Sequence, residues 1–186
     1  MTTPTGPLLE ADSLIVQQTT ALATNDFVIT DELGNERGRV DTGGSFLRRL
    51  ALGSRSFTCV DSEGQCLWRL EDTVTLGRDR WEVADAEGAP LAHIVRQISL
   101  LRHKISVDVV DGVDLSLRGS VIDWDFTVAR GEETIATIGR AWAGLARGAL
   151  GHSRYEVTFT SATPRERSIV LALLVALDRM RAKDKS

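Results

Sequence analysis

The chain of 186 residues has few of the residues that hold small folds together or bind metals. It contains two cysteines and three histidines, too few and too scattered for a disulfide scaffold or a zinc module. No apolar run approaches the ~20 residues that a membrane-crossing helix needs. Residues 1–10 lack the basic start and apolar stretch of a signal peptide. We therefore expect a cytoplasmic protein with reduced thiols, no metal or other cofactor, and no integral membrane segment.

The chain also lacks an excess of positive charge. Its 22 Lys and Arg residues are outnumbered by 26 Asp and Glu residues, which leaves a formal net charge of -4. A mildly acidic chain is not typical of nucleic-acid binders, so we expect no nucleic-acid partner. Attraction to an anionic surface would have to come from a local basic cluster. The length suits one domain that buries a substantial core without staples.

Short segments rich in Val, Ile, Thr, Phe and Trp, separated by turn residues, are what the chain has in quantity. Four of them echo one another, at 27–34, 57–64, 81–88 and 126–131, each with an aromatic residue, alternating polarity and a glycine-containing turn. This pattern is typical of β-hairpins. Pattern and turn signals together predict about twelve strands, near residues 14–20, 26–31, 36–42, 56–61, 66–72, 80–85, 91–97, 102–110, 113–120, 123–130, 133–141 and 153–161.

The last part of the chain changes character and predicts a helix at about 164–182. Thr163 suits the N-cap, Pro164 the first helical position, and Glu166 the third position of a capping box. Residues 169–177 are apolar on every face of that helix. A helix that is apolar all round must be surrounded by protein, and the rest of the chain supplies only strands to surround it.

The fold that uses all of these parts is all-β with one helix. We predict a twelve-stranded closed antiparallel β-barrel that encloses the apolar C-terminal helix. A barrel of eight strands is just filled by its own side chains, whereas twelve leave room for a helix roughly 10–12 Å across. In domain terms, residues 1–10 are expected to be a flexible N-terminal tail and residues 11–186 the barrel with its central helix.

Four stretches, in this order along the chain, carry a resemblance. They are the turn at 31–35 with the pattern Asp-x-x-Gly-Asn, then 138–142, 155–157, and the closing apolar stretch at 170–178. Over nearly all of residues 12–182 the chain resembles the LURP-one-related and phospholipid scramblase superfamily, whose barrel is shared with the C-terminal domain of Tubby proteins. The resemblance implies a twelve-stranded barrel around a C-terminal helix.

The resemblance also implies two functions to compare with the residues of this chain, calcium-driven lipid scrambling and the binding of lipid head groups. Scramblases carry an acidic calcium-binding loop before the last helix, whereas residues 161–167 here are basic and offer one carboxylate, Glu166. We therefore expect no calcium-driven lipid scrambling, since Ca²⁺ takes six to eight oxygen ligands. Tubby-like members bind phosphoinositide head groups through basic residues, and the resemblance implies a similar possibility for the basic residues of this chain.

The best candidate site is the glycine-bounded segment 43–55. It concentrates three cations among large apolar side chains, a composition that suits the surface of an anionic membrane. The candidate lipid-binding residues are Arg48, Arg49, Arg55, Phe46 and Leu47. The alternative is a solvated loop whose Phe and Leu side chains cap one mouth of the barrel, and this alternative stays open.

Other candidates have ordinary explanations. Asp123 and Asp125 flank Trp124 like a glycosidase carboxylate pair, but alternating polar residues are usual on an outer strand face. Cys59 and Cys66 are expected to face each other across a hairpin turn, as a disulfide or, in a reducing compartment, as two thiols. Asp178 would either sit in the barrel mouth with a raised pKa or pair with an Arg or Lys where the helix emerges. The histidines have no metal-binding spacing.

We conclude that the sequence favours a non-enzymatic binding module, with anionic phospholipid head groups as the candidate ligand and a peripheral membrane location. The alternatives are a protein-interaction domain, or a small-ligand carrier or enzyme that uses a barrel mouth. A carrier needs interior space, which the apolar helix is expected to fill. An enzyme needs titratable groups that converge at one rim.

Overall fold

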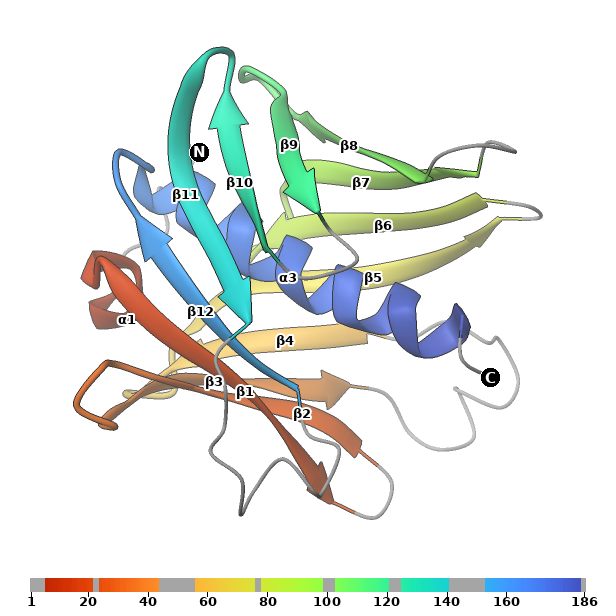
Figure 1. Cartoon of the computed structure of the whole chain (residues 1–186). Helices are drawn as coiled ribbons and strands as arrows, with labels where there is room; N and C mark the ends of the chain where they lie inside the picture. Colours follow the sequence, from red (N-terminus) through yellow and green to blue (C-terminus); the bar gives the residue numbers. More distant parts are fainter. Residues whose placement is uncertain are drawn as a thin grey trace.

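The structure is a computed structural model that describes residues 6–21, 24–43, 56–75, 78–98, 103–120, 125–140 and 153–184. Within these ranges, twelve antiparallel strands surround one long helix (Figure 1). The helices are α1 (Pro7–Glu10) and α3 (Pro164–Asp184); the strands are β1 (Ser13–Ala21), β2 (Thr24–Thr30), β3 (Glu36–Gly43), β4 (Ser56–Asp61), β5 (Cys66–Thr75), β6 (Arg78–Asp85), β7 (Pro90–Ile98), β8 (His103–Val109), β9 (Leu115–Ser120), β10 (Asp125–Arg130), β11 (Glu133–Arg140) and β12 (Arg154–Phe159).

Each strand pairs with its neighbours in sequence, and β1 pairs with β12 to close the barrel. In that closing pair, Leu14 lies opposite Val157 and Val16 opposite Tyr155, all four buried. Because β1 and β12 pair with each other, neither the first nor the last strand is an edge of the sheet. The predicted fold class, a closed twelve-stranded barrel with one C-terminal helix, is confirmed.

Three hairpins share one turn chemistry. At the first, the Asp31 Oδ1 atom accepts hydrogen bonds from the N–H groups of Leu33 and Asn35 at 3.0 and 2.9 Å. Gly34, with φ +84°, donates its N–H to the Asp31 carbonyl at 3.0 Å. The positive φ is one that glycine adopts without strain. The same carboxylate and glycine bonds recur in the other two turns, at Asp61 with Gly64 and at Asp85 with Gly88.

Each of these turns adds a bulge that shifts the register of the hairpin. In the second hairpin Val60 pairs with Cys66, and the shift that follows between Val60 and Cys59 pairs Cys59 with Trp68. Cys59 points into the core and Cys66 is partly exposed, and both thiols are free. The expectation that Cys59 and Cys66 face each other is therefore wrong, because Cys66 lies opposite Val60, the neighbour of Cys59, and successive residues of a strand point to opposite faces of the sheet.

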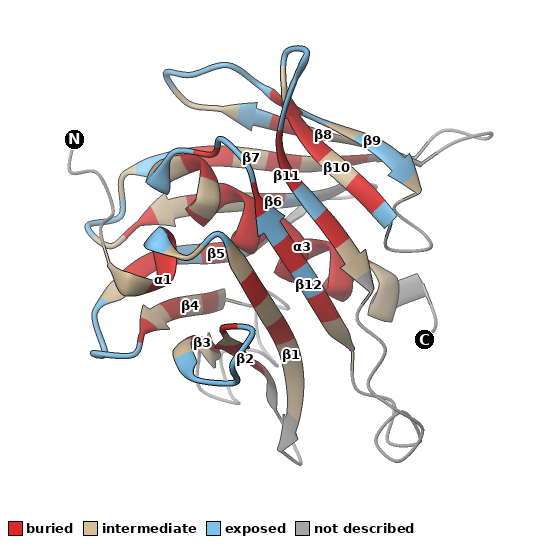
Figure 2. Cartoon of the chain, turned by 60° about the vertical axis from the view of Figure 1, so that its left-hand side comes forward, coloured by how far each residue is buried: buried red, intermediate tan, exposed pale blue. Residues whose placement is uncertain are grey.

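Helix α3 fills the barrel as predicted. Its residues 169–177 are at most 3% exposed, and Figure 2 shows the helix buried inside strands that alternate between buried and more exposed residues. The helix begins as the sequence indicates: the Thr163 N–H donates to Glu166 at 2.8 Å, and the Glu166 N–H donates back to the Thr163 hydroxyl at 3.3 Å. This reciprocal arrangement is a capping box.

The expected flexible tail is wrong for its last part, residues 6–10. Pro7–Glu10 form α1, whose Leu8 and Leu9 side chains are 0% and 2% exposed and join the core. Helix α1 packs against α3 and β3, so these two leucines cover the end of the barrel where α3 begins. Two adjacent apolar residues are too short a pattern to show periodicity, which is why sequence alone missed them.

The barrel has two ends with different roles. At the turn end, on the left and at the top of Figure 1, lie α1, the start of α3, and the hairpin turns between β2 and β3, β4 and β5, β6 and β7, β8 and β9, and β10 and β11. At the exit end, on the right, α3 ends and the chain leaves and re-enters the sheet between the remaining strand pairs.

Candidate functional site

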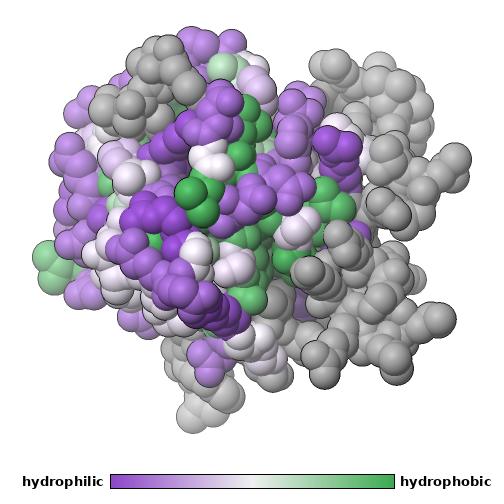
Figure 3. Space-filling model, turned by 90° about the horizontal axis from the view of Figure 1, so that it is seen from above, coloured by the Kyte–Doolittle hydropathy of each residue, from purple (hydrophilic) through white to green (hydrophobic). Residues whose placement is uncertain are grey.

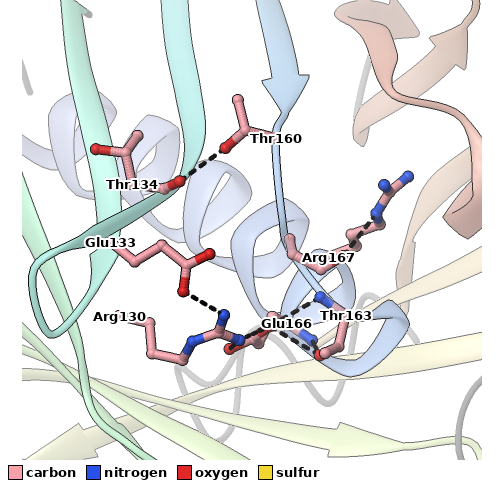
Figure 4. A network of polar contacts seen from close by, with 8 residues as sticks. Arg130, Glu133, Thr134, Thr160, Thr163, Glu166 and Arg167 are labelled. Atoms are coloured by element: carbon pink, nitrogen blue, oxygen red, sulfur yellow. Dashed lines mark hydrogen bonds and ion pairs between the residues drawn. The ribbon is translucent and has the colours of Figure 1, made fainter.

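The turn end is held closed by a network around the start of α3 (Figure 4). Arg130 Nη1 donates to both carboxylate oxygens of Glu166, at 2.8 and 3.0 Å, and its Nη2 donates to Glu133 at 2.6 Å. The Ser161 hydroxyl, followed by the Arg130 guanidinium, lowers the pKa of Glu133. The Glu166 carboxylate therefore bonds both Arg130 and the N-cap residue of the helix, and this links β10 to α3.

Two further arginines complete this network. Arg165 Nη2 donates to the Val110 carbonyl at 2.5 Å. Arg167 donates to the Ala11 carbonyl at 2.7 Å and to the Asp12 carboxylate at 2.8 Å. The carboxylate of Glu166, the one acidic group in residues 161–167, is thus committed to structure. That the loop binds no calcium stays a prediction.

At the exit end, polar groups of β12 and α3 are buried together inside the barrel. The hydroxyl of Tyr155, on β12, donates to the Asp178 carboxylate, on α3, at 2.5 Å. Burial first, and then the charge of Asp178, raises the pKa of Tyr155. Asp178 is 6% exposed. The pair fixes the rotation of α3 against β12 near the point where the helix emerges.

Further charged residues lie in the interior at this end. Asp72 on β5 and Arg96 on β7 belong to the inward-facing sets of their strands, and Arg179 follows Asp178 on α3. Their exposed fractions are 3%, 7% and 6%. Each lies in the half of its element that is nearer the exit end. The interior therefore changes from apolar in the middle of the barrel to charged at the exit end.

Exposed carboxylates dominate the surface of the turn end. They lie in all five hairpin turns there, at Glu32, Glu63, Glu87, Asp111, Asp114 and Glu132. The described arginines at the turn end are committed: Arg37 pairs with Asp31 at 2.8 Å, Arg130 and Arg167 pair with carboxylates, and Arg165 bonds a carbonyl. The turn end thus presents net negative charge to solvent.

The chain segments that connect strands at the exit end carry the opposite balance in sequence. Between Gly43 and Ser56 lie Arg48, Arg49 and Arg55, together with Phe46 and Leu47. All five predicted lipid-binding residues fall outside the described residues, so their predicted role stays a prediction. What the structure establishes is that Gly43 and Ser56, which flank them, pair with each other at the exit end.

The remaining candidate residues from the sequence have different outcomes in the structure. Asp125 is exposed at the start of β10, while Asp123 lies outside the described residues. Across the described ranges, no group of three His, Cys, Asp or Glu side chains could hold a metal ion. Of the two arrangements considered for Asp178, the structure shows a buried carboxylate bonded to the hydroxyl of the chain's one tyrosine. That partner was not foreseen.

Comparison with known proteins identifies the architecture. The model of a family described as LURP-one-related matches residues 12–178. The chain belongs to the LURP-one-related family. This LURP-one-related chain is also similar to the X-ray structure of an Arabidopsis thaliana protein, with a TM-score of 0.61 and 19% identity over 95% of this chain and 93% of that one. That likeness shows the fold. No curated protein is significantly similar to the chain.

One further property bears on the site. In the described ranges, the structure contains no helix long and apolar enough to span a bilayer.

Proposed function

We propose that this LURP-one-related protein is a non-enzymatic binding module that docks on anionic phospholipid head groups through its exit end. The observation that carries the proposal is the separation of charge between the two barrel ends. Exposed carboxylates gather in the described turns of the turn end. The sequence between the strands that meet at the exit end supplies Arg48, Arg49, Arg55, Arg102 and Arg147.

This separation gives an otherwise acidic protein a preferred orientation. An anionic membrane surface attracts nearby cations by ~1 kcal/mol each and repels carboxylates. With a net charge of -4 the whole chain would be repelled, but approach along the barrel axis presents the basic end first. Because the Debye length is ~8 Å at physiological ionic strength, carboxylates on the far side of the barrel are screened from the surface.

The test is co-sedimentation with liposomes of two compositions. We expect salt-sensitive recovery of the protein on vesicles that contain phosphatidylserine, and none on vesicles of phosphatidylcholine alone. The double variant Arg48→Glu/Arg49→Glu should lose this recovery. The matched control is Arg39→Glu/Arg69→Glu, which changes the net charge equally at two arginines exposed on the barrel wall.

The control separates a local site from a general charge effect. If both double variants lose binding equally, net charge governs the interaction and the exit end has no special role. Equal recovery on neutral vesicles would also refute the proposal, and a protein partner would become the better explanation for the basic segments. Unchanged thermal unfolding of both variants is required for either comparison.

A further inference from the structure

The wall of the barrel is paired unevenly at β8 and β9. Strand β8 pairs with β7 over His103–Val109, and β9 pairs with β10 over Leu115–Ser120. Between β8 and β9, the described residues form one pair, Val107 with Leu115. From that pair the strands diverge toward the exit end (Figure 1). We call the facing edges beyond it, residues 103–106 and 116–120, the seam.

Within the described strands, Leu117 of β9 directs its backbone groups into the seam and has no strand partner there. The Ser116 hydroxyl donates to the Ala129 carbonyl at 3.5 Å, and the Thr127 hydroxyl donates to the Arg118 carbonyl at 3.5 Å. These two carbonyls therefore point across the β9–β10 pair. Successive residues of a strand direct their backbone groups to opposite sides, so Leu117 directs its N–H and C=O into the seam. Among the described strands, none pairs with it there.

Gly119 puts a kink in β9 beyond the point where its pairing with β8 ends. Its φ is +109°, far from the negative values of an extended strand, and an added Cβ would lie 2.7 Å from the Asp125 carbonyl oxygen. Only glycine adopts this conformation readily. The kink turns β9 away from β8 while the pairing with β10 continues.

The floor of the seam is apolar. Ile105 and Val109 on β8 and Leu117 on β9 are partly buried and pack against the core. Figure 3 looks onto this face, the top of Figure 1, and shows apolar residues in a band between polar ones. On the outward side, Ser106 and Ser116 carry no charge. A segment lying in the seam would meet apolar side chains beneath it and polar ones beside it, which include Ser106, Ser116 and, further along β9, Arg118, whose guanidinium pairs with Glu132 at 3.1 Å.

We propose that the seam accepts an extended peptide segment of a partner protein as an additional β-strand on the edge of β9. An unpaired strand edge is a template for main-chain hydrogen bonding, and the side chains beneath it select the pattern of the added strand. The segment has apolar residues at alternate positions, which pack on Ile105 and Leu117, and polar residues between them. A lipid surface lacks the repeating N–H and C=O groups that this edge matches.

The test uses a capped synthetic copy of residues 103–109, which carries alternating apolar residues in the pattern required. Binding to the full-length protein is followed by backbone amide NMR. We expect shifts confined to β8 and β9, and exchange of the Leu117 amide about tenfold slower at saturating peptide. Two N-methylated versions of the peptide, each blocking alternate amides, distinguish its two edges. One should bind like the parent and the other should not bind.

Matched protein variants locate the interaction. Leu117→Thr, which keeps strand propensity but removes the apolar contact, should weaken peptide binding, whereas Leu33→Thr on an exposed turn should not change it. Equal binding of both N-methylated peptides would mean nonspecific apolar adhesion and overturn the proposal. A Leu117 amide already protected without peptide, or seam shifts that depend on protein concentration, would assign the edge to this chain or to a second copy.

Discussion

Replacing Leu8 by alanine tests whether α1 belongs to the core. Leu8 is 0% exposed, and α1 contacts both α3 and β3. Truncating a fully buried leucine costs about 2–5 kcal/mol, because transfer free energy is lost and a cavity remains. For a domain of 150–250 residues, each kcal/mol lowers the melting temperature by about 2–4 °C. Leu8→Ala should therefore melt about 4–20 °C below the unsubstituted protein.

The assay is thermal unfolding followed by circular dichroism, with Leu33→Ala as the control. Leu33 is 88% exposed in the first hairpin turn, so its truncation should change stability by no more than about 0.5 kcal/mol. A Leu8→Ala variant that melts with the control would refute the packing of α1. Residues 6–10 would then behave as the flexible tail that their sequence suggests.

Three further outcomes follow from the interior and the turns. Leu173→Asp should abolish folding, since an unpaired carboxylate in the barrel centre is among the costliest substitutions. The control Leu173→Met should lower the free energy of unfolding by less than about 1.5 kcal/mol. A folded Leu173→Asp monomer would place α3 outside the barrel. Burial raises the pKa of both thiols. In the native protein a maleimide should therefore label Cys66 slowly and leave Cys59 unlabelled. Cys59 should be labelled only after unfolding. The Asn35 amide, the most important of several partners, lowers the pKa of Asp31 from 3.8 to about 2. The contribution of the ionised Asp31 carboxylate to folding stability is therefore present above pH ~4 and lost as the pH falls through 2. NMR titration should show a midpoint near that pH, and Asn35→Ala should raise the pKa of Asp31.

The fold could be predicted because its two signals are independent. Turn residues punctuate the strands, and the uninterrupted apolar stretch at 169–177 demands enclosure on every side. The pairing register of neighbouring strands could not be predicted from these signals. The position of Cys66 opposite Val60 depends on where the turn closes, at Asp61 and Gln65, and a shift of one residue reverses the face of every following side chain.

The site was less accessible from sequence. Tyr155 and Asp178 could each be noticed, but their contact depends on the rotation of α3 inside the barrel, which an all-apolar helix does not encode. The charge separation, by contrast, was available in principle. In an up-and-down barrel, successive connections alternate between the two ends, so sorting the connections by parity separates the acidic turns from the basic segments.

The central position of α3 has a consequence for biosynthesis. The segment that fills the barrel leaves the ribosome after all twelve strands. Until it arrives, strands such as β1 and β12, whose pairing joins Leu14 to Val157, have no apolar surface to close around. Such long-range strand pairing is slow, and its folding intermediates expose apolar surface that is prone to aggregation. Nascent chains stalled before residue 164 should therefore depend on chaperones for solubility, and release of the C-terminal helix should be the step that commits the barrel to close.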